Sequence, residues 1–136
     1  MSHETLHNTI RNRFNVGVEV PEGLTGRVQY DNQKKINIED RLWCRFKVIP
    51  GDSDTAEIGG STNTQRTIGI AFVSIFQPLG SGTKTSHELV DAIKTVFRSD
   101  PDNDVTYMEA SEDNIGRSGK FWQMNVRIPF RYDVRA

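Results

Sequence analysis

The stretch FWQMNVRIPFRYDVR, residues 121–135, decides the fold of this chain. A large apolar side chain recurs at every second position, in the row Trp122, Met124, Val126, Ile128, Phe130 and Tyr132. Successive side chains of a strand point to opposite faces of a sheet, so this period predicts a strand with one buried face. Burying each large side chain is worth about 1.5 to 3 kcal/mol before chain entropy is subtracted, so the row should anchor the sheet. Pro129 lacks an amide, and we therefore expect this strand to present part of an open edge.

Two earlier runs extend the sheet. In LWCRFKVIPG, residues 42–51, apolar and polar residues alternate until Pro50 and Gly51, which should end the strand. Residues 51–64 are polar and glycine-rich, so we expect a long connection with at most one short strand. The run from Thr67 to Gln77 carries apolar residues on both faces, which predicts a central strand that is covered on both sides. Short strands are expected around residues 26–32 and 105–110.

Two helices are expected. In the first, Ser2 is a candidate cap and Leu6, Ile10 and Phe14 recur every fourth residue, before residues 15–23 break the pattern. The second should begin with a capping box of Thr85 and Glu88, followed by a stripe of apolar residues, Leu89, Ile93, Val96 and Phe97. The order of elements predicts an α+β fold, with two helices packed on one side of a largely antiparallel, twisted β-sheet of about five or six strands. We expect one domain, residues 1–136.

Composition narrows the classes of function. Seventeen basic against eighteen acidic residues give a formal charge of -1, too little to attract a polyanion by itself. No stretch resembles a signal peptide or a membrane span, so we expect a soluble protein made in the cytoplasm. Cys44 is the sole cysteine and stands at an apolar position of a predicted strand, so a buried, unreactive thiol is expected.

A glycine-bearing loop followed by a helix, FQPLGSGTKTSHEL at residues 76–89, resembles the start of a nucleotide-binding site. A phosphate loop of the common type needs glycine directly before its Lys-Thr pair, so that backbone amides converge on the phosphate. Thr83 occupies that place and Pro78 stands at the first glycine position. We expect no nucleotide here, although a small-ligand or nucleotide-binding enzyme using the 80–85 loop remains an alternative.

Other candidate sites are weak. Asp100, Asp102 and Asp104 alternate as in a calcium loop, but Val105 and Ser111 replace the required glycine and glutamate. His3 and His7 lie one helical turn apart without a third ligand, and surface histidines are the simpler interpretation. We expect no catalytic residues, no metal and no cofactor, and hence no enzyme.

A series of short motifs resembles a known family. The series begins with VQYDN at residues 28–32 and LWCRFKVIPG, continues with RTIGIAFVSIFQP at residues 66–78 and GSGT before ELVDAIKTVF, and ends with FWQMNVRIPFRY. Their order and spacing resemble the phage tail terminator-like proteins of long-tailed bacteriophages. QKKI, residues 33–36, departs from the proline and aromatic residues expected there.

The resemblance implies a structural virion protein. Such proteins form a homo-oligomeric ring, generally a hexamer, at the head-proximal end of the tail tube. The ring stops tube growth and provides the surface for head-tail joining. The implied partners are the tail tube protein and a head-completion or connector protein; no membrane and no sequence-specific nucleic acid are expected, though DNA may pass through the ring. Assembly is expected in the host bacterial cytoplasm.

Polar loops are the candidate contacts of such a ring. Residues 51–64 and 99–118 are too polar to pack on their own core, so we expect them to become ordered against neighbouring subunits or the tube. Charged residues in or beside them are candidates for the subunit or tube interface: Asp52, Asp54, Glu57, Arg66, Lys84, Arg117 and Lys120. Exposed ion pairs are worth about 0 to 1 kcal/mol each, so they would set register more than affinity. A head-tail completion protein or a tail-tube component is the alternative within the virion.

Overall fold

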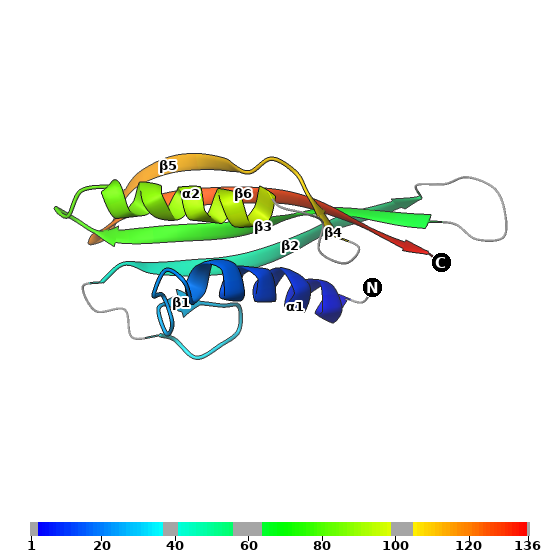
Figure 1. Cartoon of the computed structure of the whole chain (residues 1–136), viewed down its shortest axis with the longest axis horizontal. Coiled ribbons are helices and arrows are strands. Elements are labelled where there is room, and N and C mark those ends of the chain that lie inside the picture. The colour runs from blue at the N-terminus through cyan, green and yellow to red at the C-terminus, as the bar shows by residue number, and fades with distance from the viewer. Residues whose placement is uncertain (1–2, 37–40, 56–63, 99–104, 136) are drawn as a thin grey trace.

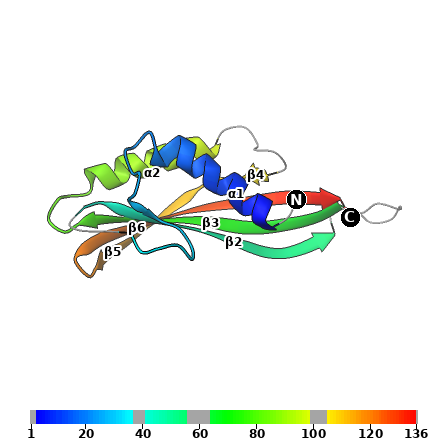
Figure 2. The same cartoon turned by 90° about the horizontal axis from the view of Figure 1, so that it is seen from below.

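The computed structural model describes residues 3–36, 41–55, 64–98 and 105–135. It has an α+β fold, as predicted, with a long sheet of six strands and two helices on one of its faces (Figures 1 and 2). The elements are α1 (His3–Phe14), η1 (Asn15–Glu19), β1 (Val28–Gln29), β2 (Trp43–Thr55), β3 (Thr64–Pro78), α2 (Lys84–Arg98), β4 (Val105–Tyr107), β5 (Ser111–Ser118) and β6 (Phe121–Arg135).

Strand β3 is central, as its two apolar faces predict, but the expectation that both faces are covered is wrong, because Ile68 on the helix-free face is 51% exposed. The sheet runs in the order β1-β2-β3-β6-β4, and β5 also pairs with β6. All pairings are antiparallel except that of β1 with β2. Strands β4 and β5 follow one another along the outer side of β6, so β2 forms one long edge of the sheet and β4 with β5 the other.

The alternating row of β6 lies on the helix-covered face and is buried from Met124 to Tyr132. The expectation that Pro129 marks an open edge is wrong, because β6 pairs with β3 on one side and with β4 and β5 on the other. The Met108 amide donates to the Pro129 carbonyl at 2.8 Å. The missing amide of Pro129 faces the same side, at the irregular junction between Tyr107 and Ser111, where the ladder is already interrupted.

Strand β2 does not end at Pro50, which is a second correction. It continues to Thr55 after a register shift between Pro50 and Ser53. Proline is tolerated in an edge strand, and the shift accommodates one extra residue as a bulge. A Cβ at Gly51 would lie 2.0 Å from the Ile68 carbonyl oxygen, so the bulge requires glycine there.

Strand β5 was missed, because residues 111–118 were expected to belong to a loop. Its sequence, SEDNIGRS, is polar, and most of its side chains are exposed or half-buried. The strand forms because β6 offers it a free side and a tight turn at Gly119 and Lys120 returns the chain. Gly119 has φ +61, which the turn tolerates only with glycine or a few small polar residues. The Ser-Gly pair before an alternating run was the available signal.

The core lies between the helices and the covered face of the sheet. Leu6, Ile10 and Phe14 are fully buried, as their spacing predicts, and the Phe14 ring stacks on Phe46 with centroids 4.7 Å apart. The helix does not stop at residue 14, contrary to expectation: it continues as the π-helical η1. At Gly17 a Cβ would lie 2.6 Å from Val96 Cγ1, so glycine permits the close approach of η1 to α2.

Candidate assembly surface

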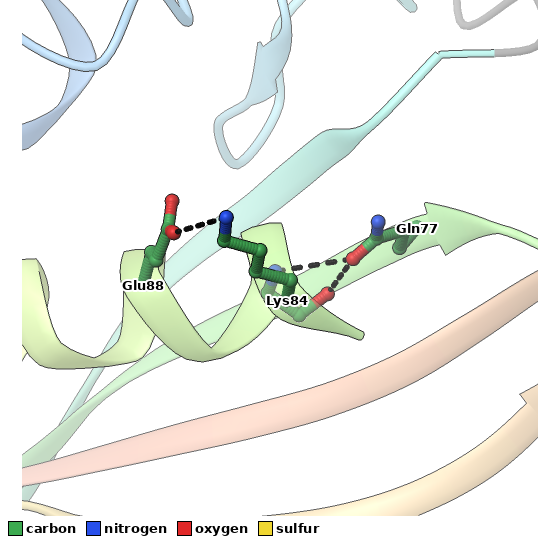
Figure 3. A network of polar contacts seen from close by, with 4 residues as sticks. Gln77, Lys84 and Glu88 are labelled. Carbon is green, nitrogen blue, oxygen red and sulfur yellow. Dashed lines mark hydrogen bonds and ion pairs between the residues drawn. The ribbon is translucent and has the colours of Figure 1, made fainter. Parts of the chain in front are cut away.

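The start of α2 is held by a side chain from the preceding strand. The Gln77 Oε1 accepts a hydrogen bond from the Ser86 amide at 3.1 Å and another from the Ser86 hydroxyl (Figure 3). Both residues are buried. The helix begins at Lys84, and the His87 amide donates to the Thr83 carbonyl at 3.0 Å, so the predicted capping box of Thr85 and Glu88 is wrong. A side chain outside the helix supplied the cap, and local spacing could not show it.

The hydrogen bonds from Gln77 affect whether the glycine loop could bind a phosphate. Gly80 and Gly82 have φ of +83 and +80, conformations that favour glycine for geometric reasons alone. A phosphate at a helix start is bound by the free amides of the first turn, and one of them is already engaged by Gln77. The Lys84 ammonium points along the helix to Glu88, at 4.0 Å, with the lysine side chain 90% exposed (Figure 3). The loop therefore resembles a structural connection more than a nucleotide site.

The candidate interface residues fall into two groups at opposite ends of the long sheet. Asp52 and Asp54 belong to the end of β2, and Arg66 lies in the facing part of β3. The register places Arg66 across from Asp54 on one side and from Asp133 on the other. Glu57 lies outside the described residues, as does the calcium-like run Asp100 to Asp104.

The second group surrounds the glycine loop. Lys84 begins α2, Arg117 lies in β5, and Lys120 is in the turn between β5 and β6. The Lys120 carbonyl accepts a hydrogen bond from the Leu79 amide at 3.2 Å, which ties this turn to the loop. All three side chains are exposed. The structure thus brings these three together and separates them from Asp52, Asp54 and Arg66 by much of the length of the molecule (Figure 1).

The helix-free face of the sheet carries a set of charges that the sequence interpretation did not single out. Its exposed cations come from two strands: Arg45 and Lys47 from β2, Arg127 and Arg131 from β6. The Arg127 Nε lies 3.1 Å from the Asp113 carboxylate of β5. The signal was present in the alternation itself, since the residues between buried positions of a strand share the opposite face.

This face is also partly apolar. Ile49 and Ile68 are 42% and 51% exposed, whereas Trp43, Phe76 and Phe121 pack together at the other end of the face. The Trp43 and Phe76 rings stack at 4.2 Å between centroids. Between these apolar zones is a hollow of about 390 Å³, lined by Asp31, Arg45, Lys47, Phe72 and Ser74. The arrangement suits contact with another macromolecule more than enclosure of a small ligand.

Titratable groups in the interior have structural roles. Burial raises the pKa of the Cys44 thiol to about 12, so the prediction of a buried cysteine is confirmed and its thiolate is disfavoured. Tyr30 donates a hydrogen bond to the Glu19 carboxylate, and burial followed by this bond raises the pKa of Tyr30. Within the described residues, no group of three or more His, Cys, Asp or Glu is placed to hold a metal ion. No helix in the same part of the chain is long and apolar enough to span a membrane.

Comparison with known proteins adds sequence and fold evidence. A family model described as phage tail terminator protein matches residues 22–130. No curated protein matches. Eleven solved chains resemble the fold; one of them shares 14% sequence identity and superposes with a TM-score of 0.63, over 93% of this chain and 94% of that chain. At this identity the structural likeness supports the fold alone.

Proposed function

The chain belongs to the phage tail terminator family, and we propose that it closes the head-proximal end of the tail tube as a ring of identical subunits. The family match over residues 22–130 carries this proposal, because it spans β1 to the greater part of β6. A phage tail structural role follows from the family. We propose in addition that the subunits form a ring, of six subunits by family resemblance. We also propose that this ring contacts the tail tube at one end and a head-completion or connector protein at the other.

Termination by shape needs no bond to be made or broken. Identical head-to-tail contacts close into a ring when their rotation is right, and such a ring has two chemically different ends. One end binds the last layer of tail tube protein, while the other does not accept a further tube subunit. That end then offers a surface to a head-completion or connector protein. Growth stops because the exposed end is sterically and electrostatically mismatched to the tube subunit.

The subunit has properties that suit this role. It is long and flat, with helices on only one face (Figure 2), and different charged residues belong to the elements at its two ends. The glycine loop, whose helix start is capped by Gln77, lies at one end together with Arg117 and Lys120. The end of β2, with Asp52 and Asp54, lies at the other. We propose these two ends as the tube-facing and head-facing contacts, without assigning which is which.

Electron microscopy of phage particles made without this protein tests the proposal. We expect tails of uncontrolled length, or tails that do not join heads, and restoration of both by adding the purified protein. Normal tails beside unfilled heads would show instead a head-tail completion role. Normal infectious particles would refute any role in the tail end. The ring is expected on isolated virion tails, assembled in the host bacterial cytoplasm.

A nucleotide-binding enzyme is the alternative from another class. Ligands that bind the native state raise the melting temperature once their concentration exceeds the dissociation constant. We expect no shift of the melting temperature with nucleotides up to millimolar concentration. A shift that disappears in Lys84→Ala would support the alternative.

A further inference from the structure

Exposed aliphatic side chains gather near one long edge of the sheet, on its helix-free face. Ile49 of β2 and Ile68 of β3 are both large and half exposed, and half-buried Ile70, the register partner of Ile49, lies between them. Together with Phe72 they form a continuous apolar band rather than scattered single residues. A band of this kind on a small protein suits contact with a partner surface.

The opposite long edge carries a hollow lined by both apolar and charged residues, between α2 and the junction of β4 and β5. Met108, 39% exposed, lies at the junction of β4 and β5 and lines a hollow of about 480 Å³. Phe97 and Tyr107 supply its aromatic part. Lys94 and exposed Arg98 of α2 also line it, and the Lys94 ammonium pairs with Glu112 at 3.2 Å. A projecting aliphatic side chain could enter such a hollow.

The two features carry one opposite pair of exposed charges. Exposed Lys47 lies beside Ile49 in β2, whereas Arg131, the register partner of Ile68, belongs to β6 and lies next to β4. Exposed Glu109 follows Met108 at the second edge, and Glu112 lies three residues further on. Opposite charges at the rim of an apolar contact favour one orientation and discriminate against others.

The two features also lie at the same height along the strands. Register places Ile49, Ile70 and Pro129 in one row across β2, β3 and β6. The Met108 amide donates to the Pro129 carbonyl, so Met108 continues that row at the far edge. Rotation about an axis parallel to the strands keeps every residue at its height. In a ring whose axis runs along the strands, neighbouring subunits would therefore bring one edge beside the other without sliding.

The first edge is accessible at this height. Strand β1 pairs with β2 only at Cys44 and Arg45, and no other described strand pairs with that side of β2. Beyond Arg45 the outer side of β2 is thus uncovered by any described strand. We infer that the Lys47–Ile49–Ile68 surface of one subunit packs on the Met108–Glu109 junction of the next, as the head-to-tail contact of the ring. The inference rests on the proposed ring and names the surface that closes it.

Charge reversal tests this contact. Lys47→Glu and Glu109→Lys each place like charges together, which should reduce ring formation at least about tenfold. The double variant restores an opposite pair and should recover most of the assembly. The readout is the fraction of tails that carry a terminal ring, in particles from a phage lacking the natural protein and supplied with each variant. Infectious titre provides a second measure.

Two further variants separate the contact from folding. Glu22→Lys makes the same charge change at an exposed residue that belongs to neither the Lys47–Ile49–Ile68 surface nor the Met108 hollow, and should assemble as the natural protein does. Ile68→Ser should lower ring formation while the melting temperature stays close to that of the natural protein. Normal assembly by both single charge reversals, or no recovery in the double variant, would overturn the inferred contact. Failure of the terminator role would appear separately, as normal tails in particles without any copy of the protein.

Discussion

The two faces of β3 differ in burial, although both carry apolar side chains of the same strand. On the helix-covered face, Ala71, Val73 and Ile75 are fully buried under the two helices. On the other face, Ile68 is 51% exposed and lies opposite Arg131 of β6. Both faces are apolar in sequence, so hydrophobicity does not distinguish them. Only the covered face stabilises the subunit fully, and the open face remains available for assembly.

Truncating one residue on each face measures this difference. We expect Ile75→Ala to lower the free energy of unfolding by about 2 to 5 kcal/mol, because it leaves a cavity in the core. Ile68→Ala should change it by about 0.5 kcal/mol or less, as surface substitutions usually do. Urea denaturation of the dilute, unassembled subunit measures both values. Equal losses would show that the open face is covered in the free protein.

Packing of the helices on the covered face depends on one glycine. Gly17→Ala should destabilise the protein by about 1 to 3 kcal/mol, because its new methyl group meets Val96. Val96→Ala removes the obstructing atoms, and the double variant should regain most of the loss. Thermal or urea unfolding of the four proteins gives the coupling energy. Additive losses in the double variant would place the strain elsewhere.

Burial of Cys44 on the covered face should also change how the stability of the protein depends on pH. The folded pKa of Cys44, raised by burial to about 12, exceeds its ordinary value of 9.0. The thiol therefore holds its proton more tightly in the folded state, and its contribution is constant below pH 9 and lost as pH rises toward 12. We expect a loss of about 1.4 kcal/mol per pH unit from this group above pH 9. Cys44→Ala should reduce the slope, and an unchanged slope would contradict the assignment.

Removing the hydrogen bonds that join β3 to α2 should reduce stability by a smaller amount. Gln77→Leu removes the acceptor for the Ser86 amide and should cost about 0.5 to 2 kcal/mol, as loss of a helix cap does. Gln77→Glu retains an acceptor near the helix start and should cost less. Amide hydrogen exchange in the first turn of α2 should accelerate in the leucine variant. Unchanged exchange would mean that water replaces the cap without cost.

The smallest effect is expected for an ion pair on the open face. Asp113→Asn breaks the contact with Arg127, whose atoms lie 3.1 Å apart with both side chains 45% exposed. Solvent screening limits such a pair to about 0 to 1 kcal/mol. The melting temperatures of the variant and the natural protein should differ at low salt and should coincide at high salt. A large loss at high salt would show that the open face is less hydrated than its exposure indicates.

The long elements could be predicted from the sequence because their signals are local. The period of the apolar residues identifies the type of each long element. This holds for the alternating row of β6, the two-sided run of β3 and the apolar stripe of α2. Strand β5 could not be found in this way, because a polar segment becomes a strand only when β6 offers it hydrogen bonds. The cap from Gln77 and the bulge at Gly51 also depend on residues distant in sequence.

The candidate interface residues were chosen from the sequence without knowledge of which strands share a face. Charged loop residues were selected one by one, and the structure shows that Arg66 and Lys84 lie toward opposite ends of the molecule. Those residues stay untested as contacts. The cations of the open face were not selected, although their alternate spacing in β2 and β6 was visible. The order of strands in the sheet determines which charged residues lie side by side on one face, and the sequence alone does not give that order.

The amino-acid sequence by itself determined which residues alternate, where the helices run and which family the motifs resemble, because periodicity and turn residues act within a few positions of the chain. Only the tertiary structure decided that the covered face of β3 is the one with Ala71, Val73 and Ile75, that Pro129 lies inside the sheet, and that the Ile49 and Met108 edges share one height. The physical reason is that strand pairing and helix packing join residues far apart in sequence. Their geometry depends on the whole sheet rather than on any single segment.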